Sequence, residues 1–186
     1  MRVKGTLVRN RLEFLRDRYG SEAPPAVLRA LTPEEQRKVQ SVLPASWIPF
    51  SLINNLDDEI VRQYGSGSPE VCRDIGAFAA QRNLSSVYRT FLEQAAGDPH
   101  RLLEGLAGLH STSYDWGGVK TTRLGDHRGQ VEIDYAGGAS RTNCLASVGF
   151  YGEALRQLAV KNAKVLERAC QAAGGIRCLC EVSWEV

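Results

Sequence analysis

The stretch NCLASVGFYGEALRQLAVKNAKVLERACQAAGGIRCLCEVSW, residues 143–184, holds one helical pattern followed by two strand patterns. From Asn143 onward, apolar or small residues recur at intervals of three and four, which is typical of a helix with one buried face. Residues 163–170 and 176–186 favour strands, and the segment 172–175 between them ends in two glycines, which is typical of a turn. We therefore expect a helix capped by Asn143, followed by an antiparallel strand pair.

The rest of the chain predicts helices before this stretch and one further hairpin. Apolar residues at helical spacing fill most of residues 9–110, and Thr32-Pro33-Glu34-Glu35 has the form of a capping box. Alternating residues at 119–124 and 131–135 flank a turn and predict an antiparallel hairpin. The expected fold class is α+β, with N-terminal helices packed on a small antiparallel sheet.

Charge and hydropathy exclude two classes of partner. The 186-residue chain has a formal net charge of +2 with interspersed signs. The basic segment 9–18, with Arg11 near its centre, alternates with acids, so we interpret it as a solvated helix face, as we do the acidic run 57–59. No apolar run is long enough to cross a bilayer, and the N-terminus lacks a signal-peptide pattern. We expect a cytoplasmic protein that binds neither nucleic acid nor membrane.

Four of the five cysteines lie in the last quarter of the chain. Cys144 would open the predicted helix, Cys170 would end the first strand, and Cys178 would begin the second. The glycine turn sets Cys170 opposite Cys178, and the helix can return Cys144 to them. Three thiolates and the carboxylate of Glu167 would complete a tetrahedral shell for Zn²⁺.

Two other interpretations of these residues stay open. The cysteines can be small buried hydrophobes, or two neighbours can form a disulfide. Cys180 shares a strand face with Cys178, so it can replace Cys178 as a ligand or act as a redox partner.

Several motifs in this region resemble the C-terminal half of the 4-vinyl reductase domain. They are Cys144-Leu-Ala-Ser-Val-Gly149-Phe-Tyr-Gly152, Glu167-Arg-Ala-Cys170, Gly174-Gly-Ile-Arg-Cys178 and Val182-Ser-Trp184. That domain belongs to the superfamily of the heme nitric-oxide-binding sensors and of the small subunits of the TRAPP vesicle-tethering complex. The whole chain resembles still more closely a bacterial family of unknown function restricted to Myxococcales.

The resemblance implies a TRAPP/4-vinyl-reductase-like fold and a structural zinc. In phenol-sensing activators of this superfamily, Cys, Glu, Cys and Cys hold the zinc, and the intervals here, 23, 3 and 8 residues, are similar. The implied ligands are Cys144, Glu167, Cys170 and Cys178.

The resemblance also implies a division of the chain and a function. Residues 1–65 would form an N-terminal strand and helices that serve dimerisation. Residues 66–186 would form the 4-vinyl-reductase-like domain with its C-terminal zinc hairpin. The expected function is signalling: a homodimer senses a small apolar or aromatic ligand and reports to an unidentified output protein.

Four residues are candidates for the ligand pocket. His110, Tyr114 and Trp116 lie just before the predicted hairpin, and His100 lies one helix earlier. Aromatic rings with nearby imidazoles can line a pocket and hydrogen-bond a phenol-like hydroxyl, although such residues also serve as core or cap residues. One alternative is a heme-binding gas sensor with His100 or His110 as axial ligand. Another is a protein-interaction adaptor without a small ligand.

An enzyme is not expected. The sequence has no Gly-x-Gly-x-x-Gly after a predicted strand and no Gly-x-Ser-x-Gly nucleophile elbow. A closed zinc shell would also offer no position for an activated water.

Overall fold

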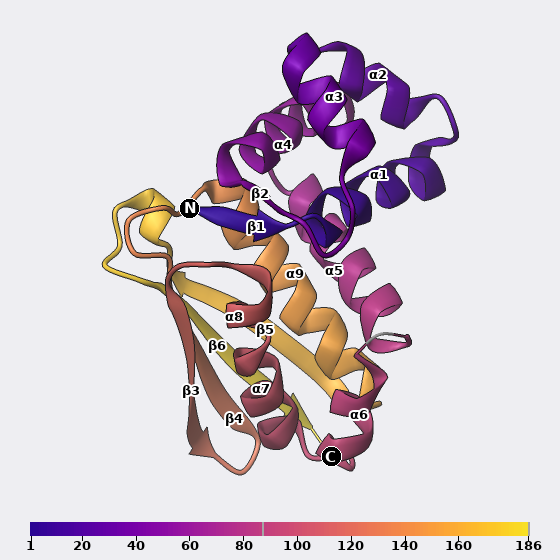
Figure 1. Cartoon of the computed structure of the whole chain (residues 1–186). Coiled ribbons are helices and arrows are strands. Elements are labelled where there is room, and N and C mark those ends of the chain that lie inside the picture. Colours follow the sequence, from indigo (N-terminus) through magenta and orange to yellow (C-terminus); the bar gives the residue numbers. More distant parts are fainter. Residues whose placement is uncertain (87, 186) are drawn as a thin grey trace.

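A four-stranded antiparallel sheet forms one side of the computed structural model, which describes residues 1–86 and 88–185 (Figure 1). The strand order is β3-β4-β6-β5, and the strands are Gly118–Gly125 (β3), Arg128–Asp134 (β4), Lys161–Ala169 (β5) and Cys178–Glu185 (β6). Along β4 and β6, buried residues alternate with more exposed ones, so the sheet has one buried face. The two predicted strand pairs both form, and pairing of β4 with β6 joins them.

Helices make up most of the chain before the sheet. They are α1 (Thr6–Tyr19), α2 (Ala23–Arg29), α3 (Pro33–Ser41), α4 (Phe50–Tyr64), α5 (Val71–Leu84), α6 (Arg89–Ala95), α7 (Pro99–Gly108), α8 (His110–Ser113) and α9 (Arg141–Gln157). A short 3-10 turn, η1 (Gln171–Ala173), precedes β6, and β1 (Arg2–Lys4) pairs with β2 (Trp47–Pro49). The predicted α+β class is confirmed. In the described part of the chain, no helix has the length and apolar character needed to span a membrane.

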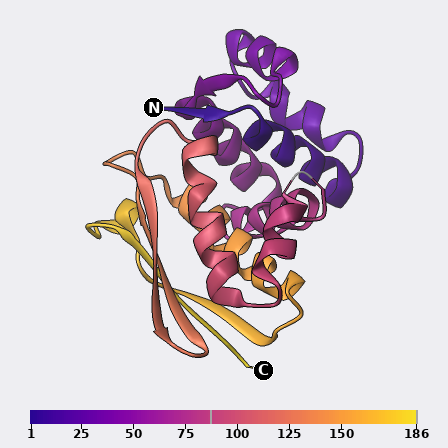
Figure 2. The same cartoon turned by 60° about the horizontal axis from the view of Figure 1, so that its bottom comes forward.

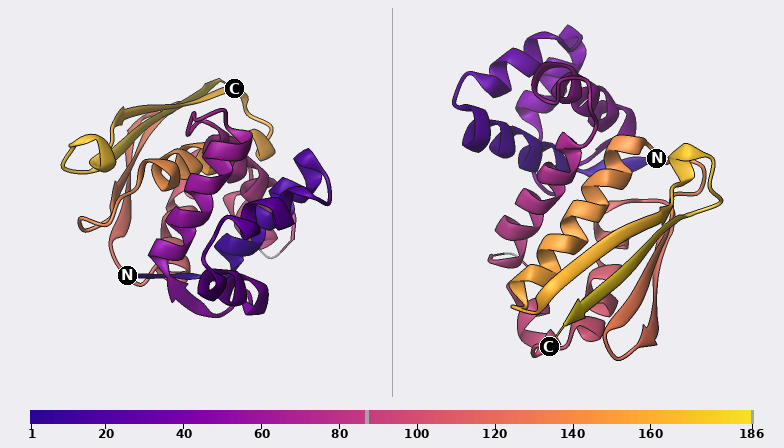
Figure 3. Two further views of the ribbon diagram at one scale, coloured as in Figure 1. Left: turned by 90° about the horizontal axis from the view of Figure 1, so that it is seen from above. Right: turned by 180° about the vertical axis from the view of Figure 1, so that it is seen from behind.

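The helices cover the buried face of the sheet from two directions. Helices α1 to α4 gather at one end of the molecule (Figure 1). Helix α9 runs along β5, which Figure 3 shows from behind. Helix α7 lies beside the β3–β4 hairpin (Figure 2). Because α7, α9, β4 and β6 contribute to one hydrophobic core, both helices pack on the buried face.

Helices α5 and α9 cross in backbone contact. A Cβ atom at Gly76 of α5 would lie 1.8 Å from the carbonyl oxygen of Ala146 in α9. A Cβ atom at Gly149 of α9 would lie 1.9 Å from the carbonyl oxygen of Arg73 in α5. Since the side chains at a contact set the distance between two helix axes, these glycines permit a very close crossing.

Two hydrophobic cores meet at this helix pair. One core contains the buried face of the sheet, α7 and much of α9, and the other contains α1, α2 and α4. Ile75 of α5 and Leu145 of α9 belong to the second core, whereas Ala80 and Val148 of the same helices belong to the first. The pair α5–α9 therefore connects the sheet to the N-terminal helices.

A buried ion pair between Arg11 and Asp57 joins α1 to α4. Arg11 Nε and Nη2 lie 2.5 and 2.8 Å from the two carboxylate oxygens, and the side-chain exposures are 4% and 0%. Arg11 Nη1 also donates a hydrogen bond to the backbone carbonyl of Leu7. The prediction that residues 9–18 and 57–59 form solvated faces is therefore wrong at Arg11 and Asp57.

We expect Asp57→Ala to lower the free energy of unfolding by about 3–5 kcal/mol, because it leaves the buried Arg11 charge without a partner. Urea denaturation followed by circular dichroism measures this. The matched control is Glu59→Ala, which breaks an exposed pair with Arg62 on the same helix and should change stability little. Equal effects of the two substitutions would contradict a structural role for the buried pair.

Candidate functional site

A cavity of about 130 Å³ lies where α1, α5, α8 and α9 meet the buried face of β4. Its wall is largely apolar and aromatic, with Leu7, Ile75, Leu106, Ile133, Phe150 and Tyr151 among its lining residues. An engineered apolar cavity of about 150 Å³ accepts benzene, so this volume suits one six-membered ring. Thr6, Asn10 and Asn83 line both the cavity and a surface groove beside α1, which gives a route to solvent.

Asn143 lines this cavity with an amide nitrogen that lacks a partner. The residue is 1% exposed, and its Oδ1 accepts a hydrogen bond from the Tyr114 hydroxyl at 3.0 Å. Its Nδ2 has no hydrogen-bond partner among the described residues. A buried donor left unpaired in this way costs about 1–3 kcal/mol.

The other polar groups beside Asn143 are already paired with one another. The Ser147 hydroxyl donates to the backbone carbonyl of Asn143 at 3.1 Å, and the Tyr135 hydroxyl lies 2.8 Å from Ser147 Oγ. Since Ser147 uses its hydrogen on the carbonyl, Tyr135 acts as donor to Ser147. None of these groups accepts a hydrogen bond from Asn143 Nδ2 in the structure.

The start of α9 explains why the Asn143 side chain is free. Ser140 is the cap of this helix, and its hydroxyl accepts a hydrogen bond from the backbone N–H of Asn143 at 3.3 Å. The prediction that Asn143 caps this helix is therefore wrong, because the cap lies three residues earlier. Its side chain turns to the cavity because Ser140 performs the capping.

His110 and Tyr114 form a flat aromatic stack in the cavity wall. Their ring centroids lie 4.6 Å apart with an interplanar angle of 10°. His110 Nε2 lies 2.9 Å from the carbonyl oxygen of Trp116, and since a carbonyl only accepts, Nε2 carries the hydrogen. Burial lowers the pKa of His110 and raises the pKa of Tyr114. Both groups are neutral near pH 7. Arg11 also lines the cavity, but its charge is balanced by Asp57, so the cavity favours a neutral ligand.

The structure places two of the four predicted pocket residues in the cavity wall. His110 and Tyr114 line it, whereas His100 and Trp116 are not among its lining residues. His100 Nε2 lies 3.0 and 3.2 Å from two backbone carbonyls of the β3–β4 turn. The Trp116 ring packs against Phe50, with centroids 5.0 Å apart. Both rings have structural contacts outside the cavity.

The sequence interpretation missed Tyr135, Asn143 and Ser147. Asn143, Ser147 and Tyr151 are spaced by four residues, which places polar and aromatic groups on one helix face. This spacing is the signal that could have identified them. Tyr135 directly follows β4 and carries no comparable signal.

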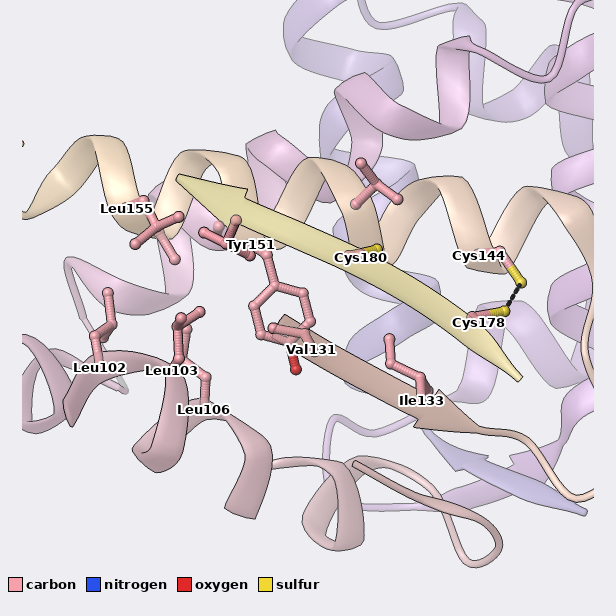
Figure 4. Packing of buried hydrophobic residues seen from close by; sticks show 14 of the residues in the cluster. Leu102, Leu103, Leu106, Val131, Ile133, Cys144, Tyr151, Leu155, Cys178 and Cys180 are labelled. Atoms are coloured by element: carbon pink, nitrogen blue, oxygen red, sulfur yellow. Dashed lines mark hydrogen bonds between the residues drawn. The ribbon is translucent and has the colours of Figure 1, made fainter. Parts of the chain in front are cut away.

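Three thiols gather next to Asn143. The sulfur atoms of Cys144, Cys170 and Cys178 all lie within 4.8 Å of one another, and the Cys144 and Cys178 sulfurs are 3.2 Å apart (Figure 4). All three residues are buried. Glu167, the fourth predicted ligand, directs its Oε2 to Arg141 Nη1 at 2.5 Å. The structure thus brings together three of the four residues predicted to bind metal.

Hydrogen bonding and burial give the cysteine thiols of this region different pKa values. The pKa of Cys178 is lowered, mainly because its sulfur accepts a hydrogen bond from Cys144 and also one from the backbone N–H of Gln171. The same contact raises the pKa of Cys144. Burial raises the pKa of Cys180 to about 12, so this thiol stays protonated. Of Cys144, Cys178 and Cys180, Cys178 therefore forms a thiolate most readily.

The fold is similar to that of H-NOX proteins. Comparison with protein families and with curated proteins finds no match. An H-NOX protein from S. oneidensis in the Fe(II)NO ligation state has a TM-score of 0.76 and 13% identity, with 98% of this chain and 99% of that chain covered.

Two further H-NOX structures agree. An oxygen-binding H-NOX domain related to soluble guanylate cyclases, as the oxygen complex, has a TM-score of 0.73 and 14% identity, covering 98% and 95% of the chains. A structure that probes the function of heme distortion in the H-NOX family has a TM-score of 0.71 and 15% identity with the same coverage. The predicted heme nitric-oxide-binding type of fold is confirmed, while the 4-vinyl reductase and Myxococcales resemblances stay predictions.

The prediction of Zn²⁺ as the cofactor is wrong. The similar solved structures reported above are H-NOX proteins, which are described with Fe(II) and heme. In addition, Glu167 Oε2 is ion-paired with Arg141, and Glu167 is not among the groups that meet within 4.8 Å, which are the three cysteine sulfurs. The cysteine spacing predicted the meeting of three thiols, but it did not identify a cofactor.

The residues around the cavity also do not fit a heme group. The cavity of about 130 Å³ is smaller than the roughly 300–1,000 Å³ of pockets for drug-sized ligands, and a porphyrin is at least as large as such ligands. Of the two predicted axial histidines, His100 lies outside the cavity, and the Nε2 of His110 is held by a backbone carbonyl, so neither offers its Nε2 there. Figure 4 shows that α7 instead directs leucines, including Leu106, toward the core.

We expect the buried His110 to make stability depend on pH. Its pKa is lower in the folded protein than the unfolded value of about 6.5, so the unfolded chain binds the proton first. The stabilisation is fully present above about pH 6.5 and is lost as the pH falls below that value. Urea denaturation from about pH 7.5 to 5 should show a smaller loss for His110→Gln than for the wild type. His127→Gln, on the exposed β3–β4 turn, should keep the wild-type slope.

Proposed function

We propose that this chain is a non-enzymatic sensing domain whose cavity binds a small, neutral, single-ring molecule with an acceptor oxygen. The unpaired Nδ2 of Asn143 carries this proposal, because a ligand oxygen would supply the acceptor that the protein lacks. The cavity volume limits the ligand to about one ring. The aromatic wall and the neutral His110 and Tyr114 favour an uncharged, largely apolar molecule.

The position of the cavity supports sensing. A ligand there would contact α1, which belongs to the N-terminal core, and β4, which belongs to the sheet core. Binding can therefore favour one arrangement of the two cores over another. A ligand that binds one arrangement more tightly shifts the conformational equilibrium towards it. We propose that a partner protein reads this change and that residues 1–65 mediate homodimer formation.

We expect benzaldehyde to bind more tightly than styrene, since the two molecules have nearly the same shape and only benzaldehyde has an acceptor oxygen. One hydrogen bond of about 0.5–1.5 kcal/mol corresponds to a preference of roughly 2- to 10-fold. Isothermal titration calorimetry measures both affinities. Asn143→Ala should abolish the preference while styrene still binds, and Ala79→Phe should fill the cavity and remove both.

A variant on the exposed β3–β4 turn, His127→Gln, serves as the matched control and should bind both compounds like the wild type. Equal affinities of the wild type for benzaldehyde and styrene would contradict a role for Asn143 in ligand selection. Failure of every neutral single-ring compound to bind would contradict the proposed function itself.

A heme-binding gas sensor is the second candidate, favoured by the H-NOX likeness over 98% of the chain. Addition of hemin followed by absorption spectroscopy tests it. Under the main proposal, hemin gives no stoichiometric shifted Soret band. If the wild type binds heme stoichiometrically and His110→Ala or His100→Ala does not, the ligand is heme and not a single-ring molecule.

A further inference from the structure

The thiols of Cys144 and Cys178 face each other at short range. Cys144 lies in the first turn of α9 and Cys178 begins β6, and their sulfur atoms are 3.2 Å apart (Figure 4). A disulfide bond is about 2.05 Å long, so the sulfurs need to approach by only about 1.1 Å. Rotation of the two cysteine side chains would bring the sulfurs together.

The surroundings give the two sulfurs different roles. The Cys178 sulfur accepts hydrogen bonds from the Cys144 thiol and from the backbone N–H of Gln171, 3.2 Å away. Two donors directed at one sulfur favour negative charge there, so Cys178 is the attacking thiolate. Cys144 keeps its proton and is placed to resolve an oxidised Cys178.

We propose that Cys144 and Cys178 form a reversible disulfide when the protein meets hydrogen peroxide. The Cys178 thiolate attacks one peroxide oxygen, the O–O bond breaks, and the other oxygen takes up the proton that the Cys178 thiol released and leaves as water. The Cys144 sulfur then attacks the sulfenic sulfur of Cys178, the S–O bond breaks, and the oxygen leaves as a second water with the Cys144 proton. Two thiols and one peroxide thus give one disulfide and two waters.

The disulfide would act on the ligand cavity through α9. Asn143 directly precedes Cys144, so a bond from Cys144 to β6 fixes the helix turn that carries the unpaired amide. This coupling rests on the proposed function, whereas formation of the disulfide does not. We expect the oxidised and reduced proteins to differ in benzaldehyde affinity by about fivefold or more, the lower range of allosteric coupling.

The test is oxidation of the reduced full chain with hydrogen peroxide, followed by thiol counting under denaturing conditions and by peptide mass spectrometry without reductant. We expect the free thiols to fall from five to three, a peptide pair linked through Cys144 and Cys178, and full recovery with dithiothreitol. Cys144→Ser and Cys178→Ser should each lose the link. Cys72→Ser, in the other core, should retain it.

Other outcomes would overturn the proposal. These are a link that uses Cys170 or Cys180 instead, irreversible sulfinic acid at Cys178, unreacted thiols, or a stoichiometric metal that must be removed before the thiols react. Circular dichroism of the serine variants checks that they fold, and Cys144→Ala provides a second, apolar replacement. If the disulfide forms but benzaldehyde affinity does not change, only the coupling to the cavity is contradicted. If neither the oxidised nor the reduced protein binds benzaldehyde, the proposed function is contradicted.

Discussion

Where α5 crosses α9, Gly76 and Gly149 leave no side chain between the two backbones. A larger residue at either glycine would place its Cβ atom within 2 Å of a carbonyl oxygen of the other helix, so the helices would have to separate. Both hydrophobic cores include residues of this pair, and the cavity is lined by both helices. The sheet, the N-terminal helices and the candidate site therefore depend on this one crossing.

The first turn of α9 combines two kinds of chemistry. Asn143 brings an unpaired donor to a largely apolar and aromatic cavity, and the adjacent Cys144 belongs to a buried thiol cluster. The likeness to H-NOX proteins covers nearly the whole chain, yet the interior differs from what a heme requires. A shared fold fixes the arrangement of helices and strands, and the side chains that face the cavity decide what it can bind.

Local signals predicted the elements well because they act over a few residues. The capping box of Thr32 and Glu35 forms, and helices such as α4 occur within residues 9–110, as the sequence indicates. Contacts between distant residues were not predictable in this way. Arg11 and Asp57 each look like surface charges, and only their meeting across 46 positions explains their burial. The sequence predicted Asn143 as the helix cap, whereas Ser140, three residues earlier and also a favourable capping residue, is the cap in the structure.

The Arg11–Asp57 pair gives the two ends of the molecule different responses to ionic strength. On the outer face of the sheet, Glu181 is held between Arg128 and Arg168, and these charges are largely accessible to dissolved ions. Salt screens such exposed pairs over about 8 Å at physiological concentration, whereas a pair closed off from water is screened far less. Concentrated salt should therefore loosen the strand-to-strand charge contacts while the link between α1 and α4 stays intact.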